Sequence, residues 1–141
     1  MNMFDHKIIV GLSTIYKKEG SLLETLSSSG TAGTLNYLLT TPQIMEIIIE
    51  ASYNMLDPLL PDGYITVGKL IELSHEQPTL TLTGGIISVI LTVTKIDGNK
   101  IYLDVACYDD IGLICKGMYE KAIVNKDSLM EATYRRAQSK L

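Results

Sequence analysis

The sequence lacks most of the patterns that mark proteins acting on nucleic acids, metals or redox partners. Its 141 residues carry a formal net charge of −4, and Lys17-Lys18 and Arg135-Arg136 are the only basic pairs that stand out. Binding to a phosphate backbone needs a basic face, so nucleic acid is an unfavourable partner. The two cysteines, Cys107 and Cys115, are too far apart for a C-x-x-C motif. We interpret them as free thiols of a protein in a reducing cytoplasm.

Signatures of other chemistries are also missing. We find no zinc-ligand spacing, phosphate-binding glycine loop or nucleophile elbow, and we expect neither a metal nor a cofactor. Residues 1–16 lack the apolar core and cleavage site of a signal peptide. The uncharged run 77–94 is rich in threonine and β-branched residues, which predicts strands and no membrane span. The length suits one domain, residues 1–141.

One stretch, residues 40–58, predicts a long helix around which the chain is organised. Thr41 is a good N-cap, and Pro42 fits the first helical position because its missing N–H costs nothing there. Pro58 cannot continue a helix, so the helix should end near Asp57.

The predicted helix is apolar on most of its circumference. Glu46, Glu50, Asn54 and Asp57 recur at helical spacing and form one narrow polar stripe, which we expect to face water. The remaining positions are mostly isoleucine, methionine, alanine and leucine. The rest of the chain must therefore wrap around this helix.

The other segments predict strands joined by short turns. We interpret residues 1–34 as an N-terminal strand, within Lys7–Ser13, and a candidate lid loop; residues 126–141 are a tail with a terminal helix from Asp127. The predicted later strands are Leu35–Leu39, Tyr64–Glu76, Ile86–Ile96, Lys100–Tyr108 and Leu113–Asn125. This order predicts an α+β fold in which an antiparallel sheet curls around one central helix. A dimer that joins two sheets edge to edge would protect the sheet edges.

Several motifs are similar to those of hot-dog thioesterases related to fluoroacetyl-CoA thioesterase, over roughly residues 35–125. Their order and spacing carry the resemblance more than any single motif does. They are Thr41-Pro42, the segment Leu56 to Gly63, Val67-Gly68 before His75, Gly84, the Lys95 to Ile101 hairpin, Tyr108 to Ile114, and Gly117 to Val124.

The resemblance implies a hot-dog fold, a homodimer or dimer of dimers, and hydrolysis of a short acyl-CoA thioester at the subunit interface. The family uses a threonine at the helix start, a glutamate within the helix and a histidine on the next strand. Thr41 and His75 match the first and last of these. Ungapped counting places Ile49 at the glutamate position and Glu50 one residue later, about 100° away around the helix. Glu50 is therefore either a displaced catalytic carboxylate or a solvated member of the polar stripe.

The strand pattern places His75 on the inner face with Ile71 and Leu73. Imidazole exchanges protons near neutral pH, so His75 could donate to a thioester oxygen or activate water. A structural histidine bonded to a carbonyl is the alternative. Gly84 and Gly85 would let an acyl chain or pantetheine approach closely, or would only bend a strand.

Two further candidates for substrate binding, Ile49 and Lys121, come from the resemblance. Lys121 stands where the family has an arginine, but lysine lacks the planar fork of arginine. We predict an acyl-CoA thioesterase-like homodimer that acts without metal, nucleic acid or membrane. The alternatives are a non-catalytic acyl-CoA or small-ligand binding protein and a dimeric scaffold.

Overall fold

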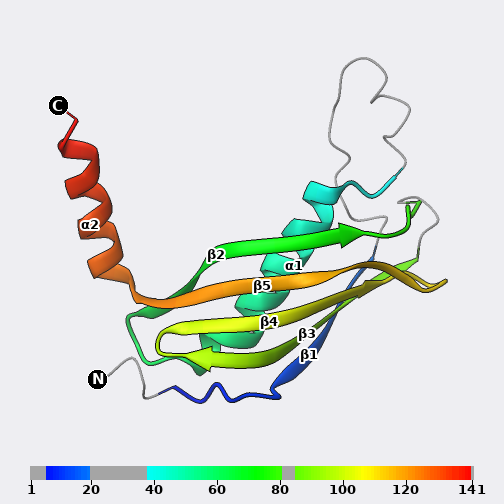
Figure 1. Ribbon diagram of the computed structural model, residues 1–141, viewed down its shortest axis with the longest axis horizontal. Helices are drawn as coiled ribbons and strands as arrows, with labels where there is room; N and C mark the ends of the chain where they lie inside the picture. The colour runs from blue at the N-terminus through cyan, green and yellow to red at the C-terminus, as the bar shows by residue number, and fades with distance from the viewer. Residues whose placement is uncertain (1–5, 20–37, 81–84, 141) are drawn as a thin grey trace.

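The computed structural model describes residues 6–19, 38–80 and 85–140. Five antiparallel strands form one sheet in the order β1-β3-β4-β5-β2, and the long helix α1 lies against one face of it (Figure 1). The elements are β1 (Ser13–Glu19), α1 (Thr41–Leu56), the short 3-10 helix η3 (Asp57–Leu59), β2 (Tyr64–His75), β3 (Ile86–Asp97), β4 (Lys100–Tyr108), β5 (Leu113–Asn125) and α2 (Lys126–Gln138). The predicted α+β hot-dog architecture is confirmed.

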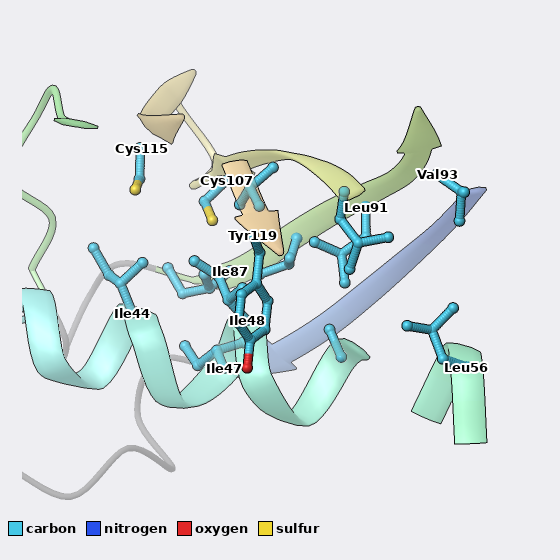
Figure 2. Close-up of a cluster of buried hydrophobic side chains, with 14 of the residues drawn as sticks. Ile44, Ile47, Ile48, Leu56, Ile87, Leu91, Val93, Cys107, Cys115 and Tyr119 are labelled. Carbon is cyan, nitrogen blue, oxygen red and sulfur yellow. The ribbon is translucent and has the colours of Figure 1, made fainter. Parts of the chain in front are cut away.

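The core lies between α1 and the inner face of the sheet (Figure 2). Ile44, Ile47 and Ile48 of the helix are fully buried against alternate residues of β3, β4 and β5. Strand alternation directs Leu91 and Leu103 toward the helix, while their neighbours Thr92 and Asp104 face outward. The buried side chains thus fix which face of each strand meets α1.

The hairpins follow the predicted turns closely. Asp97 pairs with Lys100 across a two-residue loop, in which Gly98 has a φ of +60°. A positive φ at the turn suits glycine and matches the right-handed twist of the flanking strands. The predicted bounds of β4 and β5 are also those of the structure.

The first strand was predicted six residues too early. The apolar segment Lys7–Leu12 is irregular, and Gly11, with a φ of +93°, precedes the true edge strand at Ser13–Glu19. A continuous apolar segment is typical of a strand, which favoured the earlier position. The true strand β1 instead carries polar residues on both of its faces. Most of the predicted strand Leu35–Leu39 and of the candidate lid loop lies outside the described residues; Leu38 makes a single bridge to Leu80.

The described residues contain no helix that is both long and apolar enough to cross a membrane. The terminal helix was predicted from Asp127, and α2 begins one residue earlier, at Lys126. Asn125 caps it by accepting a hydrogen bond from the backbone N–H of Ser128 at 3.0 Å. No residue of α2 is buried, and the helix stands away from the sheet (Figure 1).

Candidate active site

The N-terminus of α1 is capped by Thr40, and the prediction that Thr41 is the N-cap was wrong. The Thr40 hydroxyl accepts a hydrogen bond from the backbone N–H of Gln43 at 3.3 Å. The Gln43 side chain in turn accepts one from the backbone N–H of Thr40 at 2.8 Å. This reciprocal capping box satisfies two backbone donors. Thr41 is therefore the first helical residue, and its hydroxyl is available for another role.

We expect Thr40→Ala to lower the free energy of unfolding by about 1 kcal/mol, because it removes the cap acceptor. Thr41→Ala leaves the capping box intact and should cost less stability. Urea denaturation of the two variants checks this order. A larger loss of stability for Thr41→Ala would contradict the assignment of the cap to Thr40.

The Thr41 hydroxyl pairs with His75. Thr41 Oγ1 lies 2.9 Å from His75 Nδ1, within hydrogen-bonding distance. His75 is the last residue of β2, and its side chain points to the inner face together with Ile71 and Leu73, as predicted. The fold thus joins two residues 34 positions apart at the positive end of a helix dipole.

The second ring nitrogen of His75 has no hydrogen-bond partner among the described residues. Nε2 is shielded from solvent, which makes the missing partner costly. A cavity of about 410 Å³ lies beside this ring, lined by Leu38, Leu39, Thr40, Thr41, His75, Gln77 and Pro78. A buried, unpaired imidazole nitrogen next to a mostly apolar cavity is suited to meet a polar group of a ligand.

A larger hollow, about 660 Å³, lies on the opposite face of the sheet. Its lining includes Glu72, Asp104 and Lys116, which are outward-facing side chains of β2, β4 and β5. We place the candidate active site at the smaller cavity. There, an unsatisfied histidine, a hydroxyl and a helix N-terminus converge on the same space.

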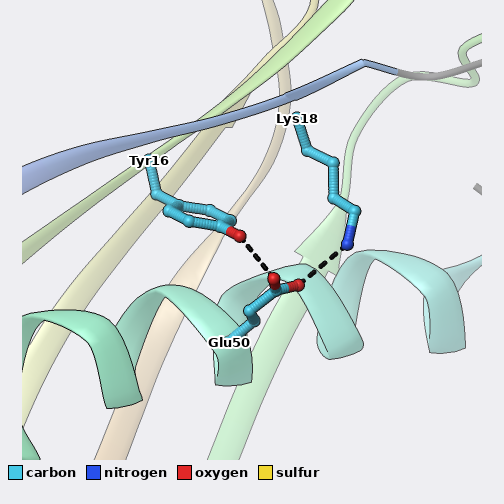
Figure 3. A network of polar contacts seen from close by, with 3 residues as sticks. All are labelled: Tyr16, Lys18 and Glu50. Carbon is cyan, nitrogen blue, oxygen red and sulfur yellow. Dashed lines mark hydrogen bonds and ion pairs between the residues drawn. The ribbon is translucent and has the colours of Figure 1, made fainter. Parts of the chain in front are cut away.

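Glu50 does not join the Thr41–His75 pair within the chain. Its carboxylate accepts a hydrogen bond from the Tyr16 hydroxyl at 2.5 Å and forms an ion pair with Lys18 Nζ at 2.9 Å (Figure 3). Both partners belong to β1, at the sheet edge opposite β2. The hydrogen bonds from Tyr16 and then from Lys18 lower the pKa of Glu50. The polar stripe is thus not wholly solvated, because Glu50 ties the helix to the edge strand.

We expect Glu50→Gln to keep kcat/KM within about threefold of the wild-type value, since the side chain is directed toward β1. Stability should fall by less than about 1 kcal/mol, because the carboxylate is 44% exposed and its ion pair is screened. The lowered pKa means that this contribution is present at neutral pH and is lost as the pH falls through the folded-state pKa. Kinetics and denaturation at pH 7 and pH 4 test both statements. A loss of activity by two orders of magnitude would restore the catalytic assignment of Glu50.

Lys121 is fully buried at a second polar site. Its Nζ donates a hydrogen bond to Ser52 Oγ at 2.8 Å and lies 3.8 Å from the centre of the Tyr53 ring. Burial lowers the pKa of Lys121 to about 8. Lys121 pairs with Gly68 on β2, seven residues before His75 and so about 23 Å from it along the strand. Within one chain, Lys121 is therefore separate from the Thr41–His75 pair. No local sequence pattern indicates that Ser52 is its hydrogen-bond partner.

The other predicted substrate-binding residues lie in different settings. Ile49 is half-buried and packs on the core, about 12 Å along the helix axis from Thr41. Gly84 lies outside the described residues. Gly85 has a φ of +67°, and a Cβ atom there would overlap the Asp110 carboxylate. Its structural role is thus to let Asp110 approach the backbone, and a binding role stays a prediction.

Comparisons with known proteins show the family and the fold of this chain. The sequence profile described as fluoroacetyl-CoA-specific thioesterase matches residues 24–127. No protein of curated function matches the sequence.

The structure is similar to several solved hot-dog proteins. A hot-dog-like protein from Thermanaerovibrio acidaminovorans shares 25% identity over 90% of this chain and 91% of its own, with a TM-score of 0.79. A hypothetical thioesterase superfamily member from Thermus thermophilus shares 24% identity over 94% and 95%, with a TM-score of 0.78. A mutant of the fluoroacetyl-CoA thioesterase FlK in complex with acetyl-CoA shares 16% identity over 92% and 98%, with a TM-score of 0.81. Since the profile matches more than half of its residues, the chain belongs to the fluoroacetyl-CoA-specific thioesterase family.

Proposed function

We propose that this protein is an acyl-CoA thioesterase that hydrolyses a short acyl-CoA at the interface of a homodimer. The observation that carries the proposal is the Thr41–His75 hydrogen bond, with the unpaired His75 Nε2 beside a cavity. Family membership supports the substrate class, and a relative of the same fold has been crystallised with acetyl-CoA. The cytoplasmic location stays a prediction.

The residues suggest a general-base mechanism with water as the nucleophile. If His75 Nδ1–H donates to Thr41 Oγ1, Nε2 is unprotonated and can accept a proton from water as its oxygen attacks the thioester carbonyl. The Thr41 hydroxyl hydrogen and the helix N-terminus then stabilise the negative charge on the carbonyl oxygen. When the C–S bond breaks, Nε2 returns the proton to the sulfur of CoA. The products are a carboxylic acid and free CoA thiol.

The dimer is proposed from one edge of the sheet. Among the described strands, β2 has a neighbour on one side only, and Leu70 on it is 47% exposed. The side of α1 above this edge carries half-buried Met45 and Ile49, on the same side of the helix as Thr41 and about 100° or more around the axis from Glu50. Pairing of β2 with β2 of a second copy would close the edge and cover these apolar side chains.

A non-catalytic acyl-CoA binding protein is the second candidate. It is favoured by one observation: no carboxylate hydrogen bond to His75 is found among the described residues, and the family's glutamate position holds Ile49. The dimeric scaffold is disfavoured by the cavity beside His75.

Thiol release from a panel of short acyl-CoAs separates the two candidates. We expect turnover by the wild type and a fall in kcat of about tenfold or more for Thr41→Val, which keeps the shape of the side chain and removes the hydroxyl. Thermal stabilisation by acyl-CoAs without any thiol release would favour the binding protein. Absence of both stabilisation and release would reject both candidates.

A further inference from the structure

Helix α2 is placed where it can act on a second copy of the chain. It starts directly after Asn125, which pairs with Tyr64, the first residue of β2. His75 is at the other end of β2, so α2 and the active site of the same chain lie at opposite ends of the sheet (Figure 1). From this point α2 extends past the free edge of β2 (Figure 1).

The far end of α2 is basic, in a chain whose net charge is −4. Arg135, Arg136 and Lys140 lie within six residues that contain no carboxylate side chain. Arg135 forms an ion pair with Glu131 at 2.8 Å. Neither Arg136 nor Lys140 has an ion-pair partner in the described part of the chain, and both are exposed. The two unpaired cations are therefore available to an anion.

Arg136 lies in the last turn of α2, and Lys140 lies in the turn that follows the helix. Leu129 is the half-buried residue of α2, and the helix contacts the adjacent strand β5. Arg136 follows Leu129 by seven positions and so lies within about 20° of the same face. Arg136 is about 10 Å further along the axis than Leu129, which is roughly two strand spacings.

A two-fold axis at the β2 edge would bring the partner's active site to this position. Antiparallel pairing along the full strand sets Tyr64 of one chain opposite the partner's His75. Since α2 begins beside Tyr64 and extends across the edge, Arg136 and the turn with Lys140 at its far end would lie over that end of the partner. The active site and the basic face would then belong to different subunits.

We propose that Arg136 and Lys140 of one subunit bind the phosphate groups of the CoA whose thioester lies at the Thr41–His75 pair of the other subunit. This inference rests on the proposed function and its dimer, and it assigns the nucleotide end of the substrate. The diphosphate and the 3′-phosphate are the only charged groups of an acyl-CoA with a neutral acyl group. Two exposed cations at the far end of a projecting helix suit such mobile anions.

The test compares substrates with and without phosphate groups. In the full chain, Arg136→Gln with Lys140→Gln should raise KM for acetyl-CoA about tenfold and leave kcat unchanged. KM for acetyl-pantetheine, which lacks the phosphates, should not change. Lys7→Gln with Lys17→Gln removes two exposed charges at the β1 side and should alter neither value. A rise of KM for both substrates, or for neither, would overturn the inference.

A mixed dimer tests whether the helix acts on the partner. We expect a dimer of one His75→Ala chain and one Arg136→Gln/Lys140→Gln chain to have the wild-type KM for acetyl-CoA. The only intact His75 in this dimer would face the intact α2 of the other chain. If the mixed dimer instead has the raised KM of the double variant, α2 acts on the active site of its own chain, and the proposal is refuted. Lack of hydrolysis or binding of either thioester by the wild type would instead reject the proposed function.

Discussion

Replacing His75 with alanine should lower kcat/KM for the best acyl-CoA by about 10²- to 10⁴-fold, the range expected for loss of a general base. The effect should appear in kcat, because in the proposed mechanism His75 Nε2 accepts the proton of the attacking water and contributes little to binding of the ground state. His75 Nδ1 also lies 2.9 Å from the Thr41 hydroxyl, so the variant would lose the contact that positions the proposed carbonyl-stabilising group. Steady-state thiol release over a range of acyl-CoA concentrations measures both constants.

His75→Gln is the matched control for this experiment. Glutamine can keep a hydrogen bond to Thr41 but cannot serve as a base at neutral pH. We expect His75→Gln to be nearly as inactive as His75→Ala while retaining acyl-CoA binding. Wild-type rates for either variant would remove His75 from the mechanism.

The free energy of unfolding should rise by up to about 3 kcal/mol between pH 8 and pH 10.5 through the titration of Lys121. Burial lowers the pKa of this lysine in the folded protein to about 8, against 10.5 in the unfolded chain. Between these values the unfolded chain binds the extra proton, so raising the pH favours the folded state. Below pH 8 Lys121 is charged in both the folded and the unfolded chain, so the free-energy cost of burying its ammonium group is at its largest.

Lys121→Met isolates this contribution, because methionine fills a similar volume without a charge. The raised pKa values of Cys107 and Tyr119 act in the opposite direction at high pH, and the variant keeps both residues. We therefore expect the difference in stability between variant and wild type to shrink from pH 7 to pH 10.5. Urea denaturation at each pH measures it. A difference that does not depend on pH would show that Lys121 keeps its ordinary pKa.

Much of the fold was accessible from the sequence because several signals agreed. The helix has prolines near both ends and an apolar pattern, and the strands from Ile86 to Asn125 combine β-branched residues with turn residues such as Gly98. Local propensity and burial specify the same structure in these segments. Their bounds were therefore predicted closely.

The errors occurred where contacts distant in the sequence decide the structure. Strand β1 carries the polar side chains of Tyr16 and Lys18 on its inner face. They are stable there because both form hydrogen bonds with Glu50 of the helix, which lies opposite. The N-cap was assigned to Thr41 because Thr40 and Thr41 are equivalent as cap residues in the sequence. The capping box with Gln43 selects Thr40.

The candidate active site could be predicted in part. Strand phase placed His75 on the inner face, and the structure brings it to Thr41 at the helix tip. The Lys121–Ser52 hydrogen bond joins residues 69 positions apart and left no local signal. The sequence shows Ile49 at the position of the family's glutamate. It does not show that Glu50 forms an ion pair with Lys18.

A crystal structure with a non-hydrolysable thioether analogue of acetyl-CoA would show which residues contact the acyl group. We expect the carbonyl oxygen of the analogue to lie about 3 Å from Thr41 Oγ1, in the cavity at the tip of α1. An acyl group bound in the hollow on the opposite face of the sheet, with the His75 ring left without a ligand, would contradict it.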